Sequence, residues 1–148
     1  GQTLRRRTLV KSPLDKIISA LNKVHAHKNL LLVAKANDEC FFPGEEGDLM
    51  ELLGNLCDNA CKWAQSKIFV TVENNNEFLR ITVNDDGPGI PAEKRTLILD
   101  RGKRLDQQAE GQGLGLSIVM DIVKTYAGEI KIDESELGGT EFSISIPV

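Results

Sequence analysis

The chain has 148 residues, of which 41% are apolar and 27% are charged, and its net charge is −4 at pH 7. These values predict one globular domain with a substantial core, and the lack of a broad basic face argues against a nucleic-acid partner. The three cysteines lack Cys-x-x-Cys spacing, which suits a protein of a reducing compartment. No apolar run reaches the ~18–20 residues that span a bilayer, so we expect a soluble fragment without direct membrane contact.

The N-terminal part of the chain predicts an amphipathic helix over residues 12–28. Ser12 and Pro13 favour the start of a helix, and apolar residues then recur every three or four positions. His25 and His27 fall at the end of this helix, without a neighbouring motif that would make them reactive. We interpret both histidines as surface residues.

A second and more regular helix is predicted at about residues 48–64, after short extended segments at 30–36 and 40–42. Leucines occupy one face of it, as expected for a helix that packs on a core. A polar stripe runs beside them and consists of Glu51, Asn55, Asn59 and Lys62. Such a stripe can be the solvated side of the helix, but asparagine is a poor helix former, so we favour a functional role.

The rest of the chain alternates between strands and helices. We predict strands at residues 67–72, 78–83, 129–133 and 140–146, with a hairpin turn at 74–76, and helices at 91–99 and 113–126, the latter ended by Gly128. These elements give one α/β domain in which helices cover one face of a mixed sheet.

Two glycine clusters, at residues 85–89 and 111–116, enclose a polar segment in which basic side chains are concentrated. The basic residues are Lys94, Arg95, Arg101, Lys103 and Arg104. Glycine lets a ligand approach the backbone, and a glycine cluster at the start of a helix offers free N–H groups to an anion. We therefore expect a polyphosphate site, although a solvated loop and a turn-capping aspartate motif would explain parts of the pattern.

The side chains around these clusters suit a nucleotide with Mg²⁺. The neutral amide oxygen of Asn59 can bind Mg²⁺ when phosphate supplies the negative charge, and the Lys62 ammonium can contact phosphate. Residues 85–86 end a strand, so only one of the two carboxylates is expected to face the pocket and accept from an amino group such as that of adenine. Gly113 and Gly115 expose N–H groups at the start of the next helix. The chain contains neither the P-loop string nor the dinucleotide-binding fingerprint.

Four motifs, taken in order, resemble the ATP-binding catalytic domain of sensor histidine kinases. They are Asn55-x-x-x-Asn59-Ala60-x-Lys62, Asp85-x-Gly87-x-Gly89, Gly111-x-Gly113-Leu114-Gly115-Leu116 and Gly138-Gly139-Thr140. This domain belongs to a superfamily, known as GHKL, that is shared with DNA gyrase, a heat-shock chaperone and a mismatch-repair protein. The resemblance implies a Bergerat fold, a two-layer α/β sandwich in which about three helices cover one face of a mixed sheet and a flexible ATP lid spans residues 90–112.

The resemblance also implies roles for individual residues, with ATP and Mg²⁺ as cofactors. Four polar side chains would act in phosphate transfer: Asn55, Lys62, Arg104 and Gln112. Asn59 and Asn55 would hold Mg²⁺ through the ATP phosphates. Asp85 would bind the adenine amino group and Trp63 would pack beside the base, whereas Asp86 fills a variable position without a role. The remaining ATP contacts would come from Gly87, Gly89, Ile90, Gly113, Leu114, Gly115, Leu116 and Thr140.

The resemblance implies that the chain is part of a larger signalling protein. Residues 1–11 would be a linker from an upstream dimerisation domain that carries the acceptor histidine, and residues 12–148 would be the catalytic domain. The expected partners are this dimerisation domain and a downstream response regulator of a two-component system. We expect the fragment to be monomeric, to transfer little phosphate alone, and to lie in the cytoplasm as part of an inner-membrane sensor kinase.

Two other functions stay open. In family members that hydrolyse ATP, a glutamate activates water at the position of Asn55, which is no base, so a gyrase-like or chaperone-like ATPase is the less favoured alternative. A degenerate nucleotide-binding domain is another, because Leu99 replaces a frequent phenylalanine and Ala109-Glu110 occupy a region where relatives carry an arginine. We expect the first change to weaken lid packing modestly and the second to weaken contact with the γ-phosphate.

Overall fold

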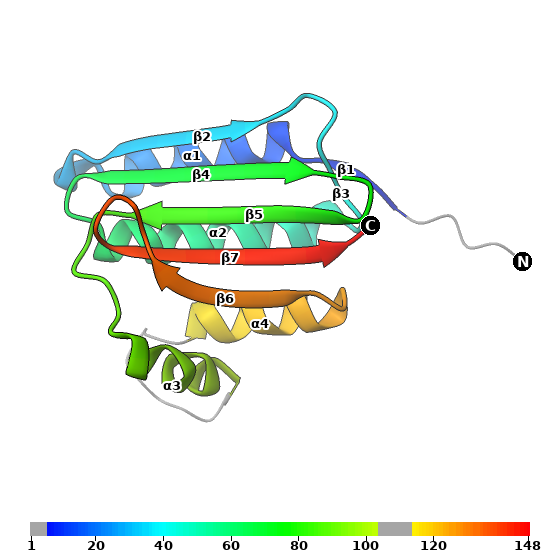
Figure 1. Cartoon of the computed structure of the whole chain (residues 1–148). Helices are drawn as coiled ribbons and strands as arrows, with labels where there is room; N and C mark the ends of the chain where they lie inside the picture. Colours follow the sequence, from blue (N-terminus) through cyan, green and yellow to red (C-terminus); the bar gives the residue numbers. More distant parts are fainter. Residues whose placement is uncertain (1–5, 104–113) are drawn as a thin grey trace, which may run out of the picture.

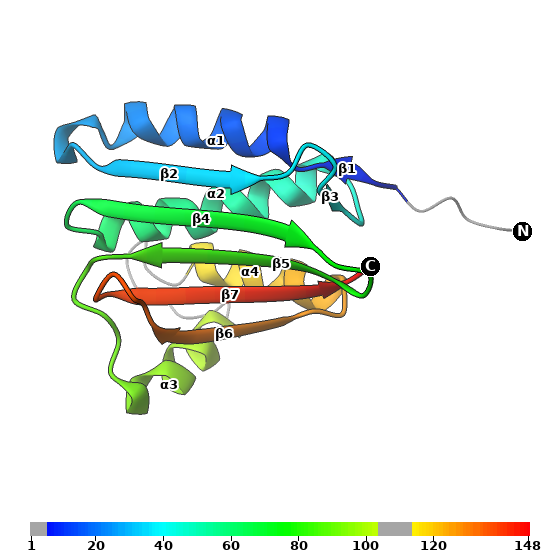
Figure 2. The same cartoon turned by 45° about the horizontal axis from the view of Figure 1, so that its top comes forward.

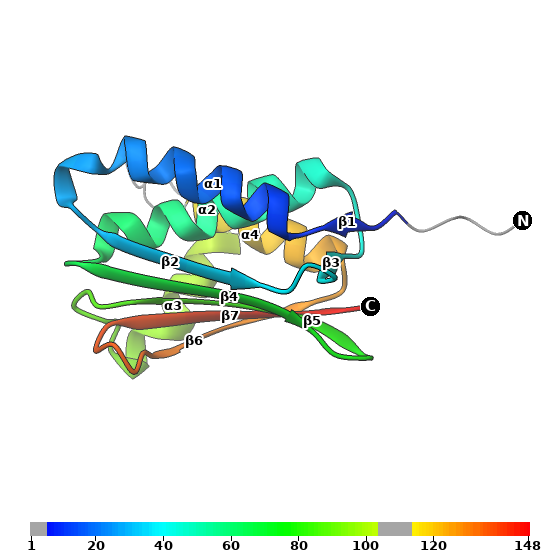
Figure 3. The same ribbon diagram turned by 90° about the horizontal axis from the view of Figure 1, so that it is seen from above.

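The computed structural model describes residues 6–103 and 114–148 and places them in two layers, a β-sheet and a layer of helices (Figures 1 and 3). The sheet has five strands in the order β2 (Leu31–Ala36), β4 (Lys67–Asn74), β5 (Phe78–Asp85), β7 (Thr140–Pro147) and β6 (Glu129–Glu134). β2 and β4 run parallel, and the other neighbours are antiparallel. The predicted α/β sandwich with a mixed sheet is confirmed.

Three helices cover one face of the sheet, namely α1 (Lys11–Val24), α2 (Glu46–Trp63) and α4 (Leu114–Thr125). The turned view in Figure 2 shows α3 (Ala92–Lys103) at the β6 end of the sheet, where it packs against α4 and β6. The smaller elements are β1 (Thr8–Leu9), which pairs with β3 (Phe41–Phe42), and the 3-10 turn η1 (Ala26–Lys28). Among the described residues, no helix is long and apolar enough to cross a membrane.

The core lies between the sheet and the helices because apolar and polar residues alternate along the strands. In β5, the side chains of Leu79, Ile81 and Val83 are buried under the helices, while the residues between them point to the other face. α2 contributes four leucines that are at most 3% exposed: Leu49, Leu52, Leu53 and Leu56. Burial of one such side chain stabilises the fold by about 1.5–3 kcal/mol, so α2 is held firmly on the sheet.

Three helices end differently from the prediction, and one of them, α3, continues to Lys103 instead of ending at residue 99. α1 stops at Val24, and Asn29, with a φ of 52°, redirects the chain after η1. After α4, Ala127 rather than Gly128 takes the left-handed conformation, with a φ of 57°. Gly128 is needed for a different reason, since a Cβ at this position would stand 2.5 Å from the carbonyl oxygen of Ser145.

The folded part of the chain starts before residue 12. Thr8 and Leu9 form β1 in antiparallel register with β3, and the side chain of Val10 is fully buried. Residues 8–10 therefore belong to the packed domain. The assignment of the residues before them to a linker stays a prediction.

One edge of the sandwich collects the segments that carry the four sequence motifs. The ends of α2 and β5 meet the starts of β4, β7 and α4 at this edge, which is on the left in Figure 1. The antiparallel register pairs Asn84, near the end of β5, with Glu141, near the start of β7. Segments that are far apart in the sequence therefore become neighbours at this edge.

Candidate functional site

Asp85 is the last residue of β5, and its carboxylate is buried at this edge. The residue is 2% exposed, and its Oδ1 atom accepts hydrogen bonds from the backbone N–H groups of Gly87, at 2.8 Å, and Thr140, at 3.2 Å. Burial raises the pKa of the Asp85 carboxyl above its ordinary value, and these two hydrogen bonds oppose the rise. Because both bonds reach Oδ1, Oδ2 is the acceptor that the amino group of a ligand can use.

Glycines surround Asp85 because the space beside it holds no further side chain. A Cβ on Gly139 would collide with the Oδ1 and carbonyl oxygens of Asp85, and a Cβ on Gly87 would collide with the carbonyl oxygen of Trp63. Gly89 has a φ of 78°, which favours glycine, and lies against Gly139. The second and fourth motifs are thus packed together, beside the end of α2.

Asn55, in the polar stripe predicted on α2, lies beside the start of α4. The Nδ2 atom of Asn55 donates to the carbonyl oxygen of Glu51 at 2.7 Å, one turn earlier in the helix. The Oδ1 atom of Asn55 lies close to Gly115, where a Cβ would stand only 3.1 Å from it. The first and third motifs are therefore neighbours, as expected if both contact one ligand.

The last turns of α2 carry the other side chains that the sequence singled out. The Oδ1 atom of Asn59 accepts a hydrogen bond from Nε1 of Trp63 at 3.3 Å, and Trp63 is 48% exposed. The Nζ atom of Lys62 lies 3.3 Å from Oδ2 of Asp58. Lys62 and Trp63 thus lie at the surface of this edge, where a ligand can contact them.

The remaining predicted contacts are only partly described. Thr140 is buried, and Ile90, Leu99 and Leu116 are partly buried against the core. Leu114 is the first residue of α4, and only its backbone is described. Predictions on the following residues lie outside the described ranges: Arg104, Ala109, Glu110, Gln112 and Gly113.

Asp86 has a structural role that the resemblance did not assign. Its carboxylate accepts hydrogen bonds from the backbone N–H groups of Gln65, Ser66 and Lys67, at 2.9–3.1 Å, and from the Ser66 hydroxyl at 2.5 Å. Burial alone would raise the pKa of Asp86, but these hydrogen bonds hold it well below its usual range. Neighbouring residues at the end of a strand point to opposite sides. The side chain of Asp85 therefore faces the interior, while that of Asp86 accepts hydrogen bonds from the turn between α2 and β4.

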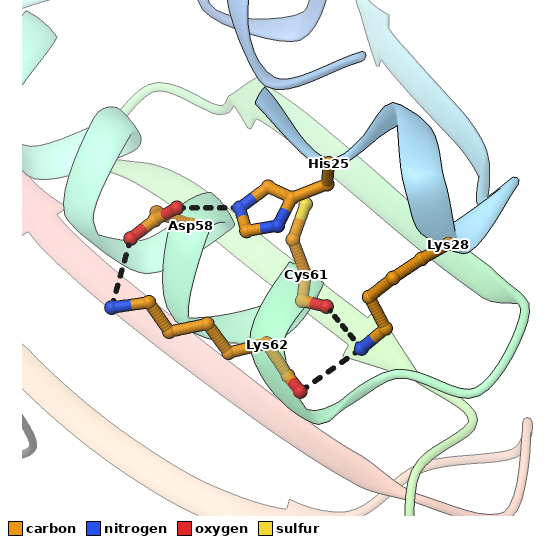
Figure 4. A network of polar contacts seen from close by, with 5 residues as sticks. All are labelled: His25, Lys28, Asp58, Cys61 and Lys62. Carbon is orange, nitrogen blue, oxygen red and sulfur yellow. Dashed lines mark hydrogen bonds and ion pairs between the residues drawn. The ribbon is translucent and has the colours of Figure 1, made fainter. Parts of the chain in front are cut away.

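The interpretation of His25 as a surface residue is wrong. Its side chain is 11% exposed, and its Nε2 atom lies 2.7 Å from Oδ1 of Asp58 on α2. Lys28 donates to the carbonyl oxygens of Cys61 and Lys62 in the same region (Figure 4). Each pair is separated by more than thirty residues, so local sequence patterns gave no signal for these contacts.

We also searched the described part of the chain for metal-ligand clusters and for cavities. Within residues 6–103 and 114–148, no three His, Cys, Asp or Glu side chains are placed to hold a metal ion. Two hollows of about 220 and 430 Å³ border α1, and neither is lined by a residue predicted to bind ATP. The edge that holds Asp85 is the candidate site because the four sequence motifs meet there.

Known proteins with similar sequences include sensor kinases. Sensor protein PhoQ of Escherichia coli K12 is 42% identical to the chain over 146 residues, and virulence sensor histidine kinase PhoQ of Salmonella typhimurium LT2 is 42% identical over 145 residues. These alignments cover 97% of this chain and 30% of each relative, so the chain spans less than a third of the curated relatives that it matches. The predicted resemblance to a sensor kinase is confirmed.

Solved structures of histidine kinases share the fold. The catalytic domain of histidine kinase ThkA gives a TM-score of 0.82 at 23% identity and covers 98% of both chains. The mycobacterial sensor histidine kinase MprB gives a TM-score of 0.81 at 22% identity and covers 97% of both chains. A sequence profile described as histidine kinase-, DNA gyrase B-, and HSP90-like ATPase matches residues 44–148. The chain therefore belongs to this ATPase family, with the fold of its histidine kinase members.

Proposed function

We propose that the chain is the catalytic domain of a two-component sensor histidine kinase, which binds Mg-ATP and donates the γ-phosphate to a histidine on a separate dimerisation domain. One observation carries this proposal. The buried carboxylate of Asp85 is held through Oδ1 by two backbone N–H groups, with the glycines of two motifs packed around it. The family match over residues 44–148 and the 42% identity to PhoQ support it.

Asp85 and Trp63 would recognise the adenine base. Oδ2 of Asp85 would accept a hydrogen bond from the exocyclic amino group, while the half-exposed indole of Trp63 would pack beside the ring. Guanine presents a carbonyl oxygen where adenine has this amino group. Two acceptors would then face each other without a proton, so the site should prefer ATP over GTP.

The phosphates would lie between α2 and the start of α4. A helix N-terminus attracts anions, and Lys62 adds an ammonium group on the facing side. Arg104 and Gln112 are proposed to reach the distal phosphates from the segment that joins α3 to α4. Together these groups would offset much of the charge of the triphosphate.

Asn55 and Asn59 fit a Mg²⁺ ion that arrives with ATP. They lie four residues apart on α2, so they share a face, and the Oδ1 atom of Asn55 lies beside Gly115 at the start of α4. Neutral amide oxygens suffice for Mg²⁺ where phosphate oxygens bring the negative charge. The ion would supply charge neutralisation for the transferred phosphoryl group.

Asn55 favours transfer over hydrolysis. In the transfer, an imidazole nitrogen of the acceptor histidine forms a bond to the γ-phosphorus while the bond to the β–γ bridging oxygen breaks, so ADP leaves and the imidazole gives up its N–H proton to water. Hydrolysis instead needs a base that activates water, and the Asn55 amide donates its N–H to the Glu51 carbonyl oxygen and offers no such base. The phosphoryl group would then pass to a response regulator, in the cytoplasm, from an inner-membrane kinase.

The first test is a calorimetric titration of the chain with Mg-ATP, beside the variants Asp85→Asn and Asp38→Asn. Asparagine at position 85 keeps Oδ1 as an acceptor but replaces Oδ2 with an N–H donor, so we expect ATP affinity to fall at least about tenfold with little change in thermal unfolding. Asp38 is a matched control because its side chain is 83% exposed. Equal affinity of the Asp85→Asn variant and the unmodified chain would contradict the site.

A second test separates the proposal from its alternatives. The chain is mixed with the dimerisation domain of a PhoQ relative and Mg-ATP, and phosphohistidine and free phosphate are both measured. Phosphohistidine without rapid phosphate release supports the proposal. Rapid phosphate release by the chain alone would indicate a gyrase-like or chaperone-like ATPase. ATP binding without either product would indicate a degenerate nucleotide-binding domain, as the residues at 99 and 109–110 allow.

A further inference from the structure

A polar network joins the end of α1 to the last turns of α2, beside the proposed phosphate site (Figure 4). Nε2 of His25 lies 2.7 Å from Oδ1 of Asp58, and Nζ of Lys62 lies 3.3 Å from Oδ2 of the same carboxylate. The Asp58 carboxylate therefore joins a ring nitrogen of His25, through Oδ1, to the ammonium group of Lys62, through Oδ2. Because a carboxylate accepts hydrogen bonds, Nε2–H of His25 is the donor in this contact.

Exposure increases from one end of this network to the other. The side chain of His25 is 11% exposed, that of Asp58 is 35% exposed and that of Lys62 is 56% exposed. A surface ion pair between two flexible side chains holds neither of them firmly, because both must lose rotational freedom. Here the largely covered side chain of His25 holds Oδ1 of Asp58, so the carboxylate is oriented by a contact that does not involve Lys62.

Asp58 lies between Asn55 and Asn59 in α2, and Lys62 follows one turn later. Lys62 is the side chain proposed above to contact phosphate. We propose that His25 is a positioning residue for the nucleotide phosphates: through Asp58, it holds the Lys62 ammonium where the triphosphate meets it. This inference rests on the proposed function and adds to it a residue from the end of α1, a helix that carries none of the four motifs.

The contact between His25 and Asp58 also ties α1 to α2, so a loss of stability alone would not reveal a positioning role. Tyr126 offers a matched control at the opposite end of α2. Its hydroxyl donates to the carboxylate of Asp48, so Tyr126→Phe also removes a hydrogen bond between a neighbouring segment and an α2 carboxylate, but at the end of the helix away from the site. Any effect seen with His25 variants and absent from Tyr126→Phe is specific to the site end of α2.

The experiment compares ATP with adenosine, because only ATP offers phosphates to Lys62. Affinities for both ligands are measured by calorimetry and competition for the unmodified chain, His25→Leu, His25→Gln and Tyr126→Phe. His25→Leu removes the donor, whereas His25→Gln retains an N–H group at a similar distance from the backbone. Lys62→Ala and the double variant His25→Leu with Lys62→Ala complete a double-mutant cycle.

We expect His25→Leu to weaken ATP binding about tenfold, as for the loss of one charge-assisted contact, and to change adenosine binding less than about twofold. His25→Gln should restore most of the ATP affinity, and Tyr126→Phe should leave the affinities for both ligands unchanged. In the Lys62→Ala background, the removal of His25 should have no further effect on ATP, because its role passes through Lys62.

Three results would overturn the inference while leaving the proposed function in place. They are an equal loss of ATP and adenosine affinity in His25→Leu, an unchanged ATP affinity in a folded His25→Leu, and an undiminished effect of His25→Leu in the Lys62→Ala background. Failure of the unmodified chain to bind ATP would overturn the proposed function and this inference together, and it would be recognised before any variant was compared.

Discussion

The side chain of Asp85 accepts a hydrogen bond from the backbone N–H of Thr140, 55 positions later in the chain, at 3.2 Å. This bond ties the end of β5 to the start of β7, the strand that pairs with it in the sheet. The carboxylate proposed to bind adenine is therefore fixed by backbone N–H groups, one at the start of β7 and one in the turn after β5. Its position should be sensitive to small changes in the glycines around it.

Gly139→Ala should disable the site. A Cβ at position 139 would collide with the side chain and backbone of Asp85, so the backbone must shift, at a cost of about 1–3 kcal/mol in the free energy of unfolding. ATP affinity should fall at least about tenfold, because the shift moves Oδ2 away from the base. Calorimetry and chemical denaturation measure the two effects. Gly47→Ala is the control, since a Cβ there meets nothing within 4 Å, and wild-type stability in Gly139→Ala would contradict the packing described.

Asp86→Asn should reduce stability in a pH-dependent way. At pH 7 the variant loses a charged acceptor of the hydrogen bonds from residues 65–67, so we expect a loss of about 2 kcal/mol in the free energy of unfolding. The pKa of Asp86 is lower in the folded than in the unfolded state, so its contribution is fully present above about pH 4 and is lost as the pH falls through the folded pKa. Denaturant titrations at several pH values should show the difference between the two proteins shrinking below about pH 4. A constant difference between pH 7 and pH 3 would contradict this account.

Trp63 should report nucleotide binding by its fluorescence. It is the single tryptophan of the chain, it is 48% exposed, and its Nε1 atom donates to Asn59 at 3.3 Å. A base packed against the indole would exclude water from it, so saturating Mg-ATP should shift the emission to shorter wavelength or quench it. The midpoint of this change should equal the calorimetric Kd. An emission spectrum unaffected by saturating ATP would place the base away from Trp63.

The three cysteines should be protected in the folded chain. Burial raises the pKa of Cys57 to about 12 and those of Cys40 and Cys61 to about 11. Because the thiolate is the reactive form, a thiol reagent at pH 7.5 should react at least about a hundredfold more slowly with the folded chain than with the chain in denaturant. Saturating Mg-ATP should slow the reaction further if labelling requires opening of the domain. Rapid labelling of a native thiol would show that its surroundings are open to solvent.

Local patterns in the sequence predicted the elements well, because the alternation along β5 and the leucine spacing along α2 each follow from one buried face. The candidate site was proposed from the glycine clusters and from Asn55 and Asn59, because glycine and asparagine are unfavourable in regular elements and their presence indicates another role. His25 could not be placed, since its partner Asp58 lies 33 residues away and only the packing of α1 on α2 brings them together. Similarly, the hydrogen bonds of Asp86 to residues 65–67 form only because β5 pairs with β4. This pairing joins two segments, so the pattern of neither segment alone predicts the role of Asp86. The roles of all the proposed site residues stay predictions, and those of Arg104 and Gln112 also lie outside the described residues.

β7 is the last strand of the chain, yet it lies between β5 and β6 inside the sheet. During synthesis, α2, β5 and α4 leave the ribosome before it does, but Asp85 then lacks the N–H group of Thr140, and β6 has no strand beside it. Domains generally fold as units, so we expect the site to form only when β7 has paired with β5. We therefore expect a nascent chain to lack the proposed ATP site until residues 140–147 have emerged.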